Sequence, residues 1–458
     1  MDRSRYNKTS KRRPRKLKSK GQKLLRNTTN IEMKINKLSN NGDGVGLAVL
    51  QKAEQKEMRN VYVANTLPGE VVRVRPRTKI GKSLEADLLE LIKPSADRKL
   101  PECKSFPICG GCQLQHLSHS AYVEWKKRSI LDLFIKANIR ILNFSGFFTS
   151  IHQKRRRASF KFKRTIHKSF IGFYANKSHQ IIELENCAVL SADLLVIKDI
   201  LLEGLDKIMP FGITIVIHVN QYDSGSDVLI MPEEKLPNII EAELASWASN
   251  TIIQRVSLAY IGDDRACLLY QHSAPNLVWG NISISPPPGS FLQPTLFGES
   301  ELQNQVFKAH KDAECCLDLF AGCGTLSAKL LSKKVNITAI DNHKECLESY
   351  QAGYRNVAQD NLLKIEIRNL FKAPVKSDFL DDFDGIILDP PRNGAFAQIK
   401  QISMTKCPLV TYVSCNPYSF IKDAKILIDS GYQLSSLSIL DQFTWTTHSE
   451  LIGNFYRK

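Results

Sequence analysis

The chain has 458 residues, 43% of them hydrophobic, and this length suggests about two to four domains. No apolar run reaches the ~18 residues of a membrane span, and the N-terminus lacks the apolar stretch of a signal peptide, so we expect a cytoplasmic protein without membrane contact. Eleven irregularly spaced cysteines disfavour a disulfide framework and favour thiols used in metal binding, catalysis or packing.

Positive charge is concentrated at the N-terminus. The chain has 63 Lys and Arg against 46 Asp and Glu, a net charge of +17. Residues 1–28 contain twelve Lys and Arg and one Asp, and so carry +11 of that charge. Such a segment cannot form a core, and we expect a disordered tail. It either aids solubility or, as we favour, binds a polyanion such as RNA or DNA.

Short strands are predicted after the tail. Residues 29–95 alternate apolar and polar side chains and are divided by NNGDGVG, Pro-Gly and Gly-Lys turns, which predicts a small β-barrel. Such a barrel is a spacer or, when basic, an RNA-binding domain. Residues 96–286 have the pattern of a central α+β domain, with a cysteine-rich loop at 101–116 and a helix near 121–137 that we expect to pack on the last domain.

The last domain is predicted to cover residues 287–458, after the Pro-rich stretch SPPPGSFLQP. Strand-like segments then alternate with helical ones: CCLDLF, a helix, ITAID, another helix, GIILD and LVTYVSC. This alternation is typical of a parallel, doubly wound α/β sheet.

A ligand site is indicated by DLFAGCGTLS, in which a strand leads through a Gly-x-Gly turn into a helix. Gly322 and Gly324 allow the backbone to approach a ligand closely. The third glycine of the dinucleotide fingerprint is missing and no Lys-Ser/Thr pair follows, which disfavours NAD and nucleoside triphosphates. Asp341 ends the next strand and can accept hydrogen bonds from ribose hydroxyls. These features favour an adenosyl ligand without a pyrophosphate, namely S-adenosylmethionine.

Two more strands end in reactive side chains, Asp389 in GIILDPPRNG and Cys415 in YVSCNP. Ligands of open α/β sheets bind at the carboxyl ends of the strands, so both residues are expected to face the same crevice as the two glycines. Asp389 could instead cap a helix, and Cys415 could be a buried, inert thiol.

Taken together, Gln293, DLFAGCGTLS, DPPRNG, YVSCNP and THSE resemble the RNA 5-methyluridine methyltransferase family. Residues 29–95 resemble its TRAM domain. Cys103-x5-Cys109-x2-Cys112 with the distant Cys187 resembles the four-cysteine site of the branch that modifies large-subunit ribosomal RNA. Spacing alone leaves iron–sulfur and zinc open, since both metals accept four cysteines; the resemblance favours a [4Fe–4S] cluster.

The resemblance implies a Rossmann-like methyltransferase domain, acting on 23S ribosomal RNA as a monomer. It implies that Cys415 is a nucleophile that adds to uracil C6, that Glu450 removes the C5 proton, and that Asp389 lies near the target base. The implied cofactor contacts are Gln293, Phe320, Gly322, Gly324, Asp341, Asn369 and Asp389. Lys154–Arg157 would hold the RNA backbone. Phe291 or Phe443 would stack on the target base, although each also suits a core.

Three positions depart from the family pattern. The chain reads Gln293-Pro294-Thr295 where the family commonly has Gln-x-Asn, Asn369 stands where an aspartate often meets the adenine, and Asp341 replaces a more usual glutamate. An amide oxygen can accept the same hydrogen bond as a carboxylate. The rival interpretations are a transfer-RNA uracil-C5 enzyme, a methyltransferase for another RNA base, and a non-enzymatic RNA-binding or assembly factor.

Overall fold

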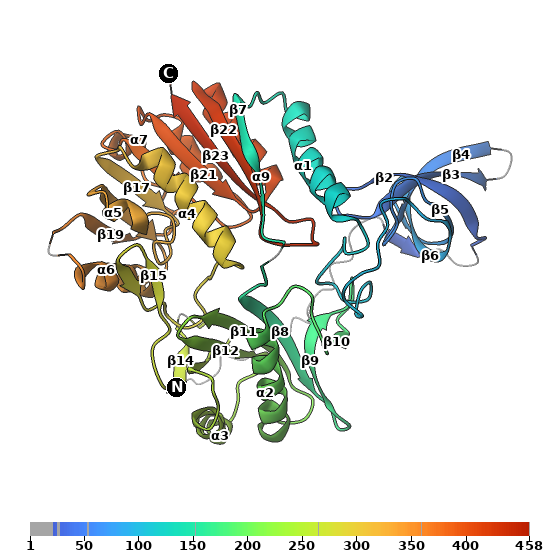
Figure 1. The fold of residues 1–458 in the computed structure, drawn as a ribbon, viewed down its shortest axis with the longest axis horizontal. Helices are drawn as coiled ribbons and strands as arrows, with labels where there is room; N and C mark the ends of the chain where they lie inside the picture. The colour runs from blue at the N-terminus through green and yellow to red at the C-terminus, as the bar shows by residue number, and fades with distance from the viewer. Residues whose placement is uncertain are drawn as a thin grey trace, which may run out of the picture. The chain divides into compact units, whose positions relative to one another are not determined.

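The computed structural model describes residues 22–24, 28–52, 55–151, 153–263, 265–358 and 360–457, without the side chains of 22–24, 50–52 and 55–57. The chain forms two compact units, Met1–Lys99 and Leu100–Lys458 (Figure 1). Among the helices of the described residues, none combines the length and apolar character needed to span a bilayer.

The first unit is a small β-barrel, as predicted. Its strands follow the order β1-β5-β2-β3-β4-β6, and a further pairing of β5 with β6 closes the sheet. Alternate side chains, among them Ile35, Val61 and Val72, point inward and form its core. The strands are β1 (Gln22–Leu24), β2 (Ile31–Leu38), β3 (Gly44–Lys52), β4 (Gln55–Val63), β5 (Val71–Ile80) and β6 (Ser83–Lys93).

Part of the expected disordered tail is ordered, so that prediction is wrong for these residues. Gln22–Leu24 form β1, antiparallel to β5 with Gln22 opposite Ile80. Thr28 Oγ1 donates a hydrogen bond to the carbonyl of Pro76 at 2.8 Å. Backbone groups at a strand edge can pair with a segment of any charge, so composition does not reveal this pairing. The rest of the tail, residues 1–21 and 25–27, lies outside the described residues.

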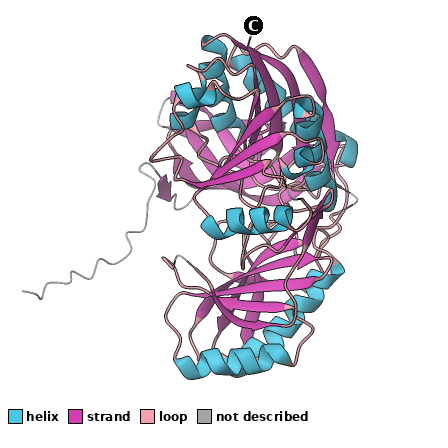
Figure 2. Ribbon diagram, turned by 90° about the vertical axis from the view of Figure 1, so that its left-hand side faces the viewer, coloured by secondary structure: helices cyan, strands magenta, loops and turns pink. Residues whose placement is uncertain are grey.

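The second unit begins with a seven-stranded sheet of the order β10-β9-β8-β11-β12-β13-β14. Two helices, α2 (Ala192–Ile208) and α3 (Asn238–Ser249), cover one face of it and enclose an apolar core (Figure 2). The strands are β8 (Arg157–Arg164), β9 (Ser169–Tyr174), β10 (Ile181–Glu183), β11 (Thr214–Tyr222), β12 (Gly225–Pro232), β13 (Arg255–Leu258) and β14 (Cys267–Gln271).

An eight-stranded sheet forms the rest of the second unit, in the order β19-β18-β17-β20-β21-β23-β22-β7. From β19 to β21 the strands are parallel, as the alternating pattern predicted, and β23 is antiparallel to β21. The strands are β7 (Asn143–Thr149), β17 (Cys315–Leu319), β18 (Asn336–Asp341), β19 (Leu363–Ile367), β20 (Gly385–Leu388), β21 (Leu409–Ser414), β22 (Tyr432–Asp441) and β23 (Glu450–Arg457).

Helices cover both faces of this sheet and create two apolar cores. On one face lie α1 (His119–Lys136), α7 (Ser377–Leu380), α8 (Phe396–Ile402) and α9 (Pro417–Asp429). On the other lie α4 (Leu296–His310), α5 (Ala328–Leu331) and α6 (Lys344–Arg355), together with the hairpin of β15 (Leu277–Trp279) and β16 (Ile282–Ile284). The result is a three-layer, Rossmann-like α/β/α arrangement.

Segments that precede residue 287 take part in this arrangement. Phe134 of α1 packs on Phe420 of α9, with ring centroids 5.8 Å apart. Lys126 and Asp441 form a buried ion pair at 2.6 Å, and β7 pairs in parallel with β22. Helix α1 therefore packs on the last domain, as expected for the helix near 121–137. Strand β7, which joins the C-terminal sheet, and the β15–β16 hairpin, which packs on it, were not expected there, because contacts between distant segments leave no trace in local periodicity.

Candidate active site

The carboxyl ends of four parallel strands meet at one edge of the C-terminal sheet. Phe320 follows β17, Asp341 ends β18, Asp389 follows β20 and Cys415 follows β21. Because the strands run in the same direction, the topology alone brings these four residues together. Glu450 joins them from β23, since this antiparallel strand begins where β21 ends, with Leu451 opposite Ser414.

The glycine-rich loop after β17 is held in place by Asp341. Phe320, Gly322 and Gly324 all have positive φ angles, of 62°, 55° and 84°. The Asp341 carboxylate accepts hydrogen bonds from the backbone N–H of Gly322 at 2.9 Å and of His343 at 2.8 Å. A side chain at Gly322 would meet nothing within 4 Å, so this part of the loop faces open space. The loop and the carboxylate together outline a site in which an adenosyl group can approach the backbone.

Cys415 stands between a strand and a helix. Asn416 is the N-cap of α9, with its side-chain oxygen accepting the Tyr418 N–H at 3.1 Å, and Pro417 occupies the first turn. The order strand, thiol, cap and proline explains the YVSCNP motif, because a helix must begin immediately after the cysteine. Burial raises the pKa of the half-buried Cys415 thiol to about 12, Glu450 and Asp389 add to the rise, and Arg392 opposes it.

Glu450 and Asp389 are the carboxyl groups beside this thiol. Glu450 is only 6% exposed, and burial raises its pKa to about 8. The nearby Asp389 adds to this rise, whereas a hydrogen bond with Gln442 and the charge of Arg392 oppose it. Burial also raises the pKa of Asp389 to about 7. Titratable groups with such displaced pKa values beside a thiol are suited to covalent and acid–base chemistry near neutral pH.

Gln442 is a site residue that the motifs did not indicate. It is fully buried, and its Nε2 donates to Oε1 of Gln293 at 2.8 Å. It also hydrogen-bonds Glu450, so one amide connects a predicted cofactor contact with a predicted base. Gln442 follows two residues after Leu440 of β22, which lies opposite Glu450 of β23. This nearness to Glu450 is the signal that could have indicated Gln442 as a site residue. Gln293 is also held by Arg156, whose Nε donates to the Gln293 carbonyl at 3.1 Å.

The four predicted metal ligands come from two segments: three lie in the loop before α1, and the fourth lies just before α2. Cys103, Cys109, Cys112 and Cys187 are half-buried free thiols. In the described part of the chain, no group of three or more His, Cys, Asp or Glu side chains is arranged to hold a metal ion. The thiols nevertheless interact: burial raises the pKa of Cys109, Cys112 and Cys187, and neighbouring cysteines add to each rise.

The cysteine loop packs on the segment that leads to Glu450. The Trp445 carbonyl accepts hydrogen bonds from the N–H groups of Gln113 at 2.8 Å and Leu114 at 3.1 Å. Tyr122 OH accepts the Trp445 N–H at 3.1 Å and donates to Asp441 at 2.6 Å. The position of the residues before Glu450 therefore depends on a loop more than 300 positions earlier in the chain.

Comparison with known proteins identifies the family. A family model described as tRNA (Uracil-5-)-methyltransferase matches residues 286–458. An uncharacterised RNA methyltransferase of Mesorhizobium japonicum is 30% identical over 422 residues, which are 92% of this chain and 96% of that protein. The chain belongs to the RNA uracil-C5 methyltransferase family. The resemblance to this family that the motifs indicated is thereby confirmed.

Two further relatives extend the comparison along almost the whole methyltransferase. A Shewanella halifaxensis protein named 23S rRNA (uracil(1939)-C(5))-methyltransferase RlmD is 26% identical over 444 residues, covering 94% of this chain and 96% of that one. The crystal structure of Pyrococcus abyssi tRNA (uracil-54, C5)-methyltransferase in complex with S-adenosyl-L-homocysteine matches with a TM-score of 0.66 and 21% identity, covering 93% of this chain and 100% of that one. This last likeness shows a shared methyltransferase fold.

Two departures from the family pattern have structural roles in this methyltransferase. Thr295, at the position where the family commonly has Asn, is the N-cap of α4, and its Oγ1 accepts the Gly298 N–H at 3.0 Å. The Asn369 side-chain oxygen accepts the N–H groups of Phe371 and Lys372, both at 3.1 Å. That oxygen is already used, so the side-chain N–H₂ is the part of Asn369 left to face a ligand.

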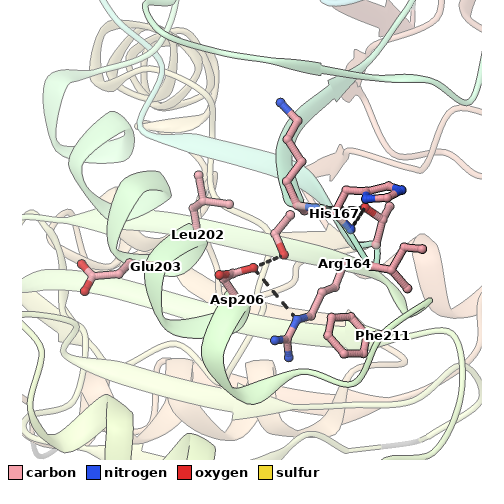
Figure 3. Close-up of a pocket in the computed structure, with 10 residues that line it drawn as sticks. Arg164, His167, Leu202, Glu203, Asp206 and Phe211 are labelled. Atoms are coloured by element: carbon pink, nitrogen blue, oxygen red, sulfur yellow. Dashed lines mark hydrogen bonds and ion pairs between the residues drawn. The ribbon is translucent and has the colours of Figure 1, made fainter.

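The central domain contains a pocket lined by residues of β8, β9 and α2 and of the loops that follow β8 and α2 (Figure 3). It lies between the β8–β9 turn and the end of α2. Asp206 accepts a hydrogen bond from Ser169 Oγ at 2.5 Å and lies 4.0 Å from Arg164 Nε. The guanidinium of Arg164 also lies over the Phe211 ring, 4.4 Å from its centroid. None of the residues predicted as site residues lines this pocket, and two of its charged groups, Arg164 and Asp206, offset each other.

Proposed function

We propose that this methyltransferase modifies C5 of a uridine in 23S ribosomal RNA with S-adenosylmethionine. The observation that carries the proposal is the convergence of Cys415, Glu450 and Asp389 at one edge of the sheet. Support for the ribosomal substrate comes from the 26% identical relative that is named as a 23S rRNA enzyme.

The proposed cofactor contacts surround the same edge. Residues that would hold S-adenosylmethionine are Gln293, Phe320, Gly322, Gly324, Asp341, Asn369 and Asp389. They fit an adenosyl ligand because the loop is open at Gly322 and Asp341 is held by two backbone N–H groups. When bound, the cofactor supplies an electrophilic methyl group.

The residues of the chain would act in sequence on the uracil ring. The Cys415 thiolate forms a bond to C6, and the electron pair of the C5–C6 double bond moves into an enolate that makes C5 nucleophilic. Once C5 carries the methyl group, the Glu450 carboxylate removes the hydrogen that remains on C5 as a proton. The electron pair of the C5–H bond then restores the double bond and expels the Cys415 thiolate. The positive charge of Arg392 partly offsets the rise that burial causes in the pKa of Cys415 and of Glu450, and so favours the thiolate and the carboxylate.

The function is tested by methylation in vitro followed by mass spectrometry of the nucleosides. We expect 5-methyluridine from 23S ribosomal RNA. 5-Methylcytidine or N-methyladenosine would overturn the proposed reaction. The description of the matching family model makes transfer RNA the second candidate substrate, so both RNAs are assayed side by side. Modification of transfer RNA alone would refute the ribosomal assignment and leave the chemistry intact.

We further propose that Cys103, Cys109, Cys112 and Cys187 hold a [4Fe–4S] cluster. The thiols fit such a group because their sulfur atoms accept backbone N–H groups: Gly111 N–H reaches Cys109 Sγ at 3.4 Å, and two N–H groups reach Cys187. A [4Fe–4S] cluster is larger than a single metal ion, so its four cysteine ligands lie farther apart than the side chains that surround one ion. Its role would be to order the loop that packs on Trp445.

Anaerobically purified protein is expected to be brown and to contain about four iron atoms per chain, since [4Fe–4S] clusters bind through Cys thiolates. Iron analysis and the absorbance spectrum provide the measurement. The matched control is Cys267→Ala, which removes an exposed thiol outside the loop and should leave the iron content unchanged. Stoichiometric zinc without iron would refute the cluster.

A further inference from the structure

In the part of the chain that the structure describes, the helices that pack on the seven-stranded sheet of the central domain are α2 and α3, and both lie on the same face of it. Helices α2 and α3 pack on the side chains of Phe160, Ile171, Ile217 and others, all on that face (Figure 2). Side chains alternate along each strand, so the opposite face carries Arg157, Lys161 and Lys163 of β8. We call this set of positions, with their neighbours Phe170 and Tyr174 of β9, the open face.

Positive charge on the open face is largely uncompensated. Among the residues that the structure describes, Arg157, Lys161 and Lys163 have no carboxylate within ion-pair distance. Glu233 is near enough to influence Lys161 but does not pair with it. On the helix-covered side, by contrast, Arg164 faces Asp206 and Lys207 bonds Glu203. A row of unpaired cations on one side of a sheet is complementary to a polyanion.

Aromatic rings alternate with these cations. The Lys161 ammonium lies 5.6 Å from the centroid of Tyr174, and the strands place Lys161 opposite Gly172 and Lys163 opposite Phe170. Gly172 lies between these two aromatic positions on β9, where the backbone carbonyl of Ile182 in β10 lies too close to leave room for a side chain. Half-buried rings on an open sheet, flanked by cations, are the platform on which unpaired bases stack in single-stranded RNA-binding domains.

The open face leads to the active site. Arg157 Nη1 donates to the Leu292 carbonyl at 3.0 Å, directly before Gln293, and its guanidinium lies 4.4 Å from the ring centroid of Phe291. Phe291 is 62% exposed, as a ring that stacks on RNA must be. From Arg157 to Lys163 the strand extends about 20 Å, at ~3.3 Å a residue, enough for several nucleotides of extended chain.

We propose that the open face binds single-stranded RNA next to the target uridine. This inference rests on the proposed function for the identity of the polymer, and it adds the surface on which the flanking nucleotides lie. The cations contact phosphates, and Tyr174 and Phe170 stack on bases.

The test measures binding of a fluorescein-labelled single-stranded oligouridylate by anisotropy at several salt concentrations. The double variant Lys161→Gln, Lys163→Gln should bind at least about tenfold more weakly at low salt. For this variant, the slope of log affinity against log salt concentration should be less steep than that of the parent protein by about 1.4, because each of the two lost phosphate contacts to a single strand contributes ~0.7 to the slope. The control, Lys207→Gln with Lys235→Gln, removes the same charge from other exposed positions and should behave as the parent protein.

A second pair of variants tests stacking. Tyr174→Ala should weaken binding by about 5- to 150-fold, the range measured for loss of one stacked base, whereas Tyr174→Phe keeps the ring and should stay within about twofold of the parent. Unchanged affinity and salt dependence in the Lys161, Lys163 variant would overturn the inference and assign the face to another partner. Because binding is read without methylation, a protein that binds through this face but forms no 5-methyluridine contradicts only the proposed function.

Discussion

Glu450→Gln is expected to stop the reaction after methyl transfer and to accumulate a covalent complex between the protein and its RNA. Glutamine has nearly the same shape as glutamate but cannot accept the C5 proton, so the Cys415–C6 bond cannot be eliminated. The complex should carry the methyl group and survive denaturation. Denaturing electrophoresis and intact mass spectrometry measure it. Glu348→Gln, an identical change at an exposed position of α6, is the control.

The same carboxyl group should set the pH dependence of product release. Burial, and then Asp389, raise the pKa of Glu450 to about 8. Only about a tenth of the group is therefore ionised at pH 7, and at pH values well below the pKa the ionised fraction falls about tenfold for each unit by which the pH is lowered. Release of methylated RNA in a single turnover should rise with pH and level off above about pH 8. A Glu450→Gln protein that turns over at the parent rate would remove Glu450 from the mechanism.

Cys415→Ala should lower the rate of methylation by about 10⁴-fold or more, the scale seen when a covalent nucleophile is removed. Without the thiol, C5 of uracil is not activated and no adduct forms. Burial raises the thiol pKa to about 12, so its proton must leave as C6 is attacked. Transfer of a labelled methyl group to RNA is the measurement.

The control for this variant is Cys407→Ala, which removes a thiol buried in the core of the same domain. It should retain RNA methylation, with only the loss of stability that a smaller core side chain causes. If Cys407→Ala and Cys415→Ala lost activity equally, the effect would be one of folding and not of chemistry.

The part of the site that lies on parallel strands could be predicted from sequence. Each of Asp341, Asp389 and Cys415 directly ends or follows an apolar run, and parallel strands bring their ends together whatever their order in the sheet. Glu450 came only from the resemblance, because an acid at the start of an antiparallel strand inside the sheet has no distinctive local pattern. The structure gives the contacts around these residues, and their roles stay predictions.

Other features depend on contacts between distant segments. Gln442 connects Gln293 with Glu450 across about 150 residues, and the cysteine loop supports Trp445 from still farther away. No periodicity records such pairs. The same reason explains why β1 was assigned to a disordered tail and why β7 was not expected in the C-terminal sheet. Spacing predicted the cysteine loop but could not choose its metal.

The most direct measurement of the central claim uses RNA that contains 5-fluorouridine, incubated with S-adenosylmethionine and the protein. Fluorine cannot be removed as a proton, so the complex should persist, and digestion followed by mass spectrometry should find a methylated nucleotide on the peptide that contains Cys415. A peptide linked through any other residue, or formation of 5-methyluridine in normal RNA with no adduct in the fluorinated one, would contradict the account.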